Sequence, residues 1–193
     1  MNRICVFTGA KPGSLPEYAT AAVELGSELA SRGYELVYGG ARVGLMGVIA
    51  DAVLSMGGRV TGVIPAGLAT KELAHRGLSE LKIVGSMHER KLVMSELSSA
   101  IIALPGGLGT LDELFEMLTW AQLGIHQKPC GILNVRGYFD HLLDFLDHAE
   151  SQRFIASNHR HMLLSQSDPR VLLDLIESYR PPEVDKRIDR NLT

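Results

Sequence analysis

Short apolar runs alternate with amphipathic stretches along most of this 193-residue chain, and no other feature of the sequence constrains the fold as strongly. The run Ala100–Leu104 holds five apolar residues, as expected of a central parallel strand that is covered on both faces. The stretch Thr110–Leu123 places Leu114 on an apolar helical face and Asp112 on the opposite, polar one. Strands that alternate with helices predict an α/β fold, here a single Rossmann-like domain with a doubly wound parallel sheet flanked by helices. Such sheets bind ligands beyond the carboxyl ends of their strands.

The same pattern gives the expected elements. Strands are expected at Ile4–Thr8, Glu35–Tyr38, Arg59–Ile64, Leu81–Val84, Ala100–Leu104 and Gly131–Val135. Helices are expected at Pro16–Ser31, Leu45–Met56, Met87–Ser98, Thr110–Leu123, Tyr138–Ala149 and Pro169–Tyr179. The weakly periodic segment Ala66–Ser79 is expected to be a loop with at most a helical turn. We expect the domain to span residues 1–180 and the charged residues 181–193 to form a disordered polar tail.

Composition excludes several classes of protein. The formal net charge of −3 and the aromatic content of 6% do not favour a nucleic-acid partner. Cys5 and Cys130 are too few and too far apart for a disulfide framework or a zinc-ligand set. No apolar stretch approaches the roughly 18 residues that span a membrane, and the N-terminus lacks a secretory signal. We therefore expect a cytoplasmic protein with no membrane partner.

Glycine is concentrated at three of the expected strand-to-helix junctions. These are Gly9–Gly13, Gly39–Gly44 and Pro105–Thr110. Glycine lets backbone N–H groups approach an anion closely, and the N-terminus of the following helix adds positive potential. Any one junction is explained by a tight turn alone, but three in one α/β chain indicate a phosphorylated ligand.

Two standard nucleotide signatures are absent. The pattern G-x-x-x-x-G-K-[ST] does not occur, which disfavours a P-loop NTPase. In the third loop, Asp112 stands where the dinucleotide fingerprint requires its last glycine, which disfavours an ordinary NAD enzyme.

A more specific motif identifies a family. Residues Pro105–Glu113 match PGGxGTxxE, and Met87–Lys91 (MHERK) lies upstream. With these motifs the chain resembles the LOG family of cytokinin riboside 5′-monophosphate phosphoribohydrolases, whose bacterial relatives include nucleosidases acting on AMP. The resemblance runs from about Ile4 to Ala149 and includes VYGG…VGLMG, GVIP and TWAQLGIHQKP. Relatives in this family have carried the label "lysine decarboxylase". This sequence does not support that activity, because it contains no lysine in a context typical of pyridoxal-phosphate binding.

The resemblance implies hydrolysis of the N-glycosidic bond of a purine nucleoside 5′-monophosphate, which releases free base and ribose 5-phosphate. It also implies a homodimer with the active site near the subunit interface, and catalysis without a cofactor. By position, the family's catalytic arginine and glutamate correspond to Arg90 and Glu113. Its substrate-contacting residues fall on Glu72, Arg90, Lys91, Gly106, Gly107, Leu108, Gly109, Thr110, Leu111, Asp112, Glu113 and Thr119. No metal site is expected, because His159 and His161 have a poor ligand spacing for a helix.

Two loops depart from the family pattern. The second loop reads Gly39-Gly40-Ala41 where many relatives have three glycines. The first reads Thr8-Gly9-Ala10 where cysteine-glycine-serine/alanine is common. Both loops are expected to line the pocket, so substrate placement in this chain can differ from that in relatives.

The chemistry of the reaction fits these residues independently. Cleavage of an N-glycosidic bond passes through a cationic, oxocarbenium-like sugar, which a carboxylate can stabilise. Backbone N–H groups of Gly106–Thr110 could hold the phosphate, with Glu113 one helical turn further, facing the ribose. Arg90 could bind phosphate or polarise the leaving base, and the sequence does not divide these roles.

Each candidate also has a plain structural explanation. Thr110 and Glu113 have the spacing of a capping box, in which Glu113 would bond to the Thr110 amide. Lys91, Glu72 and Thr119 could be ordinary surface residues, and Glu116 could be solvated or share the polar patch of Glu113. The histidines at 88 and 126 are expected to be structural.

Two other functions compete with the hydrolase. A non-catalytic carrier or sensor of a phosphorylated ligand, such as a nucleotide or molybdenum cofactor, would use similar glycine loops. The joint presence of Arg90 and Glu113 favours the enzyme. A DNA-handling function would rest on fold analogy alone.

Overall fold

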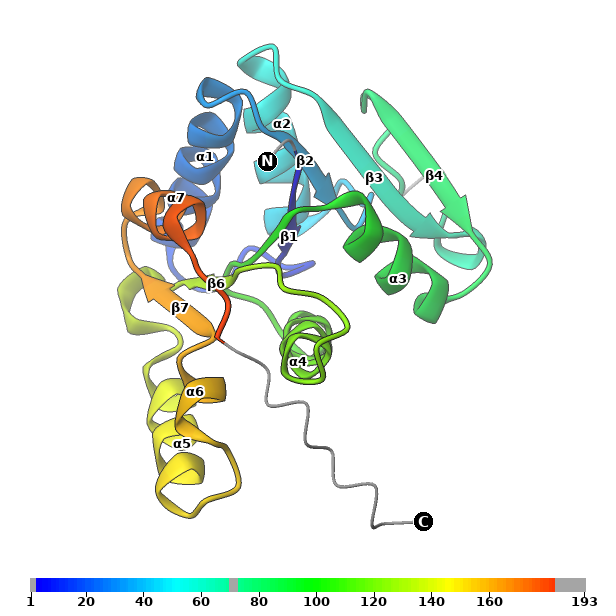
Figure 1. Cartoon of the computed structure of the whole chain (residues 1–193). Coiled ribbons are helices and arrows are strands. Elements are labelled where there is room, and N and C mark those ends of the chain that lie inside the picture. Colours follow the sequence, from blue (N-terminus) through cyan, green and yellow to red (C-terminus); the bar gives the residue numbers. More distant parts are fainter. Residues whose placement is uncertain (1–2, 70–72, 183–193) are drawn as a thin grey trace.

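A parallel sheet forms the centre of the molecule in the computed structural model, which describes residues 3–69 and 73–182 (Figure 1). Within these residues, seven strands lie in the order β4-β3-β2-β1-β5-β6-β7, each parallel to its neighbours. Their bounds are β1 Arg3–Phe7, β2 Glu35–Tyr38, β3 Val60–Pro65, β4 Glu80–Val84, β5 Ala100–Ala103, β6 Cys130–Leu133 and β7 Leu163–Gln166. The predicted Rossmann-like α/β fold is confirmed.

Helices cover both faces of the sheet. Their bounds are α1 Pro16–Ser31, α2 Gly44–Ser55, α3 Met87–Leu97, α4 Leu108–Gln122, α5 Asp140–Ser151, α6 Ser157–Arg160 and α7 Pro169–Ser178. Figure 1 shows α1, α2 and α7 on one side of the strands, and α3 and α4 on the other. Because successive strand residues point to opposite faces, β1 contributes side chains to two separate hydrophobic cores, one on each face of the sheet. One core contains Val6 of β1, Leu25 of α1, Ile49 of α2 and Leu172 of α7. The other contains Phe7 of β1, Met94 of α3, Leu114 of α4 and Leu146 of α5.

The direction of winding reverses between β1 and β5. The chain leaves β1 towards β2 on one side, while β5, which pairs with β1 on the other side, begins the second half of the sheet. The loops that follow these two strands therefore diverge and leave a crevice at their carboxyl ends. In doubly wound folds such a crevice is the expected place for a ligand.

Local sequence signals explain where the helices begin. Pro16 occupies the first turn of α1, and Gly33, with φ +74°, follows its end. At α3, the Ser86 hydroxyl accepts a hydrogen bond from the amide of Glu89, whose carboxylate accepts one from the amide of Gly85. This capping arrangement fixes the first turn of α3 immediately before Arg90.

The structure corrects the start of one helix and adds two elements. The helix expected from Thr110 begins at Leu108, because Gly107 takes the extended backbone of the N-cap position. The strand β7 and the short helix α6 were not predicted. The segment Ala66–Ser79 contains the expected helical turn as a 3₁₀ turn at Ala66–Leu68. Residues 183–193 of the expected tail lie outside the described part of the chain.

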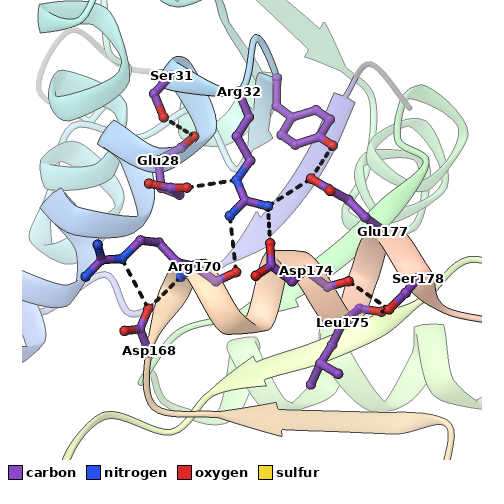
Figure 2. A network of polar contacts seen from close by, with 10 residues as sticks. Glu28, Ser31, Arg32, Asp168, Arg170, Asp174, Leu175, Glu177 and Ser178 are labelled. Carbon is purple, nitrogen blue, oxygen red and sulfur yellow. Dashed lines mark hydrogen bonds and ion pairs between the residues drawn. The ribbon is translucent and has the colours of Figure 1, made fainter.

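A polar network joins α7 to the first helix (Figure 2). The Arg32 guanidinium donates to Glu28 at 2.8 Å, and to Asp174 and Glu177 of α7 at 2.7 and 3.0 Å. It also donates to the carbonyl of Arg170 at 3.3 Å. The acidic partners are partly exposed, so this network orients α7 against α1 more than it stabilises the fold.

In the described residues, none of the helices combines the length and the apolar character that crossing a bilayer would require.

Candidate active site

A cavity of about 560 Å³ opens at the carboxyl ends of β1, β2 and β5. Its lining comes from the loops after β1 and β5, from Gly39 after β2, and from side chains of α2, α3 and α4. This volume is typical of pockets that enclose a small organic ligand. The cavity lies at the point where the winding of the sheet reverses, beyond the carboxyl ends of the strands, where this fold class is expected to bind a ligand.

The three glycine loops are bonded to one another through their backbones. The amide of Gly9 donates to the carbonyl of Pro105, and the carbonyl of Gly9 accepts from the amide of Leu45, both at 3.1 Å. A Cβ on Gly44, whose φ is +56°, would overlap the backbone of Ala10. The loops after β1, β2 and β5 therefore form one connected rim.

The glycines of the third loop serve two different purposes. A Cβ on Gly106 would overlap the Thr110 hydroxyl, so this glycine permits close packing. A Cβ on Gly107 or Gly109 would meet nothing within 4 Å, and both residues line the cavity. The first amides of α4 follow Gly107 and have no carbonyl partner within the helix. This part of the rim is therefore suited to an anion.

Arg90 and Glu113 form a buried ion pair at the cavity wall. Nη1 of Arg90, on α3, donates to Oε1 of Glu113, on α4, at 3.0 Å, and Nε of Arg90 donates to the carbonyl of Val63 at 3.0 Å. Their side chains are 11% and 9% exposed, respectively. The capping-box alternative is not what the structure contains, because Thr110 lies inside the helix and the Glu113 carboxylate is engaged by Arg90.

The environment of Glu113 sets its protonation. Burial raises the pKa of the Glu113 carboxyl above its ordinary value of 4.5, although the positive charge of Arg90 opposes this shift. Asp112 and Glu116 raise that pKa further, while Lys91 lowers it. Glu113 is therefore a carboxylate whose charge depends on the cations around it.

Gly39 makes room for the guanidinium of Arg90. A Cβ at this position would overlap Nη2 of Arg90 and crowd the methyl group of Met46. The glycine of the second loop is therefore needed for side-chain packing, since its φ is not in the left-handed region.

Lys91 lies outside the cavity lining, although it follows Arg90 directly. Its ammonium forms ion pairs with Asp112 at 3.1 Å and Glu116 at 3.0 Å. Burial by itself lowers the pKa of Lys91, but these two carboxylates outweigh burial and raise it overall. Lys91 and Glu116 are therefore placed to influence the site through charge, whereas Asp112 itself lines the cavity.

The remaining expected substrate contacts divide into two groups. Those that line the cavity are Arg90, Gly106, Gly107, Gly109, Thr110, Asp112 and Glu113. Outside its lining are Lys91, Leu108, Leu111 and Thr119. Leu108 is 88% exposed, Leu111 packs against the core, and the Thr119 hydroxyl bonds to the carbonyl of Phe115. Glu72 lies outside the described residues.

Sequence reasoning missed an aromatic wall of the cavity. Tyr18 of α1 and Tyr138 pack edge to face, with ring centroids 5.7 Å apart, and both line the cavity. The Tyr138 hydroxyl donates to the carbonyl of Gly106 at 2.6 Å. Met46 and Met87 form another part of the lining, beside Arg90. These residues come from four distant segments, and although Met46 and Met87 lie within the family motifs VGLMG and MHERK, no local pattern marks the two tyrosines.

Among residues 3–69 and 73–182, no three His, Cys, Asp or Glu side chains are grouped so as to hold a metal ion.

Comparisons with known proteins assign the family. Residues 46–176 match the family model described as "Possible lysine decarboxylase". Over 180 residues the chain is 51% identical to the probable cytokinin riboside 5′-monophosphate phosphoribohydrolase LOGL9 of Oryza sativa subsp. japonica, covering 93% of this chain and 79% of that protein. It is 50% identical to the cytokinin riboside 5′-monophosphate phosphoribohydrolase LOG1 of Arabidopsis thaliana, covering 93% of this chain and 84% of that protein. The chain belongs to the LOG family.

A solved structure outside these plant proteins is also similar. The molybdenum cofactor binding protein of the phototrophic bacterium Rippkaea orientalis superposes with a TM-score of 0.69 at 25% identity. The match covers 92% of this chain and 96% of that one. The predicted membership of the LOG family and the predicted fold are both confirmed.

Replacing Gly39 by alanine tests how Arg90 is held. We expect Gly39→Ala to lower the free energy of unfolding by about 1–3 kcal/mol, as overpacking of a closely packed site does. Urea denaturation measures this change. The control is Gly67→Ala, whose Cβ meets nothing within 4 Å and should change stability by less than about 0.5 kcal/mol. Equal stability of Gly39→Ala and the parent protein would show that the guanidinium is not held against this glycine.

Proposed function

We propose that this protein hydrolyses the N-glycosidic bond of purine nucleoside 5′-monophosphates, including cytokinin-type nucleotides, and releases free base and ribose 5-phosphate. The observation that carries the proposal is the buried pair of Arg90 and Glu113 beside an anion-suited rim. Identity of about half to curated phosphoribohydrolases over 93% of the chain supports the same reaction.

The cavity provides a place for each part of the substrate. The 5′-phosphate lies against Gly107, Gly109 and Thr110, where the first amides of α4 have no helical partner. Glu113 is one turn further along the same helix, so the ribose bound to that phosphate lies beside its carboxylate. The base then extends towards Met46 and Met87, whose flexible apolar side chains suit a purine with an apolar N6 substituent.

Glu113 stabilises the sugar as the bond breaks. The electron pair of the bond between C1′ and the base nitrogen leaves with the base, and C1′ becomes cationic. Only Oε1 of Glu113 is bonded to Arg90, and no described residue hydrogen-bonds to Oε2. This oxygen is therefore available to face the cationic sugar, or to accept a proton from the water that attacks C1′.

Arg90 has a different part. Its Nε and Nη1 are engaged by the carbonyl of Val63 and the carboxylate of Glu113, which leaves Nη2, beside Gly39, to contact substrate. Its charge favours the ionised form of Glu113 in spite of burial. Arg90 thus favours the charged form of the Glu113 carboxylate and orients it, and its Nη2 can donate to the departing base.

A carrier function is the second candidate. The structural similarity to a molybdenum cofactor binding protein favours it, because the two proteins share the fold over 92% of this chain. A carrier does not require a buried carboxylate, bound to an arginine, next to the ribose position. The hydrolase is therefore the better supported of the two.

The decisive experiment incubates the protein with AMP and with its N6-isopentenyl derivative. We expect free base and ribose 5-phosphate from at least one of them, and a reduction of about 100-fold or more in kcat for Glu113→Gln. Chromatography measures the base. Glu24→Gln, on the exposed surface of α1, is the matched control and should keep full activity. Saturable binding of these nucleotides without release of base would establish the carrier instead.

The enzyme is also proposed to be a homodimer. The support is a set of exposed apolar side chains on α3 and just after α4: Leu92 is 47% exposed, Leu123 51% and Ile125 64%. Apolar side chains exposed on neighbouring elements are typical of an interface. Light scattering should report twice the mass of one chain, and a mass of 21.0 kDa would contradict the dimer.

A cytoplasmic location, and partners limited to the substrate and a second copy of the chain, complete the proposal. The free, buried thiols of Cys5 and Cys130 support a reducing compartment.

A further inference from the structure

Lys11 is a cation of the cavity lining whose function is unassigned. It is exposed and lies in the loop that follows β1. The other charged residues of the lining are Arg90, Asp112 and Glu113, and each of them is in an ion pair. Lys11 forms no ion pair with any described residue, so its charge is available to a ligand.

The backbone at Lys11 is held firmly. Gly44 packs closely against the backbone of Ala10 and Lys11, and the two hydrogen bonds of Gly9 attach the loop to its neighbours. Pro12 follows, and a residue before proline is restricted to extended conformations. The Cα of Lys11 is therefore fixed relative to the start of α4, and only the side chain remains free to move.

The rim on which the phosphate is proposed to lie needs such a cation. The amides of α4 offer partial positive charge, but a phosphate ester carries up to two full negative charges. The charge of Arg90 does not supply the balance, because the Glu113 carboxylate already compensates it in the ion pair at the cavity wall. A lysine serves phosphate as a mobile point charge and requires no fixed fork geometry.

We propose that Lys11 binds the 5′-phosphate of the substrate across the rim from α4 and makes binding depend on that phosphate. This inference rests on the proposed function for the identity of the substrate. It assigns the discrimination between nucleotide and nucleoside to the loop after β1, and the bond cleavage to Arg90 and Glu113.

The test replaces Lys11 by methionine, which removes the charge and keeps most of the stem. The loss of a hydrogen bond between charged groups should weaken binding of ribose 5-phosphate by about 10-fold or more. The KM for AMP should rise similarly while kcat stays within about threefold, because the contact with the phosphate stabilises the bound substrate and the transition state equally. Any slow cleavage of adenosine, which has no phosphate, should be unchanged.

Two controls separate charge from structure. Lys11→Arg should retain most of the affinity, and Lys82→Met, at a lysine paired with Glu80 on β4, should behave as the parent protein. Unchanged affinity of Lys11→Met for ribose 5-phosphate would overturn the inference. Calorimetry with ribose 5-phosphate does not require turnover, so it tests Lys11 even if no nucleotide is hydrolysed.

Discussion

The buried ion pair of Arg90 and Glu113 is the interaction on which the site depends. Two opposite charges out of water are tolerated only when good geometry and further hydrogen bonds compensate for lost hydration. Here the Val63 carbonyl accepts a hydrogen bond from Nε of Arg90, and Gly39, which has no side chain, leaves space for the guanidinium. Because Arg90 comes from α3 and Glu113 from α4, the pair couples the crossover before β5 to the helix after it. This contact between α3 and α4 therefore also sets the position of the Glu113 carboxylate in the cavity.

The glycine loops complete the site in a way that their sequences only partly reveal. Gly44 and Gly106 are required because neighbouring backbone or side-chain atoms occupy the space of a Cβ. Gly107 and Gly109 face open space at the cavity, where a ligand can approach the amides of α4. The first group builds the rim and the second leaves it accessible. Both are needed for a phosphate to lie, as we propose, one helical turn from the Glu113 carboxylate.

The alternation of apolar runs and amphipathic stretches predicted the fold class and most elements, because burial on both faces of a parallel sheet leaves a strong pattern. It missed β7, whose Ser165 and Gln166 are half-buried at the edge of the sheet and break the apolar run. It also placed the start of α4 at Thr110, since a threonine is a common N-cap, whereas Gly107 takes that position.

The site was predictable where a motif marked it and less so elsewhere. The motifs MHERK and PGGxGTxxE predicted Arg90 and Glu113, and the structure brings these two side chains together. Adjacent residues on a helix point about 100° apart, so Lys91 turns from the cavity towards Asp112 and Glu116. Tyr18 and Tyr138 meet only after the chain has folded, and a pattern along the sequence cannot register such a contact.

The central claim is that Glu113 acts as a carboxylate whose pKa is set by the charges around it, and the pH dependence of kcat/KM tests this most directly. Because burial raises the pKa of Glu113, kcat/KM should fall as the pH is lowered, and the midpoint of this acid limb should lie above pH 4.5. Lys91→Met removes a charge that lowers this pKa and should move the limb to higher pH. Glu116→Gln removes a charge that raises it and should move the limb to lower pH. Opposite shifts support the account, whereas an acid limb that neither substitution moves would show that another group controls the reaction.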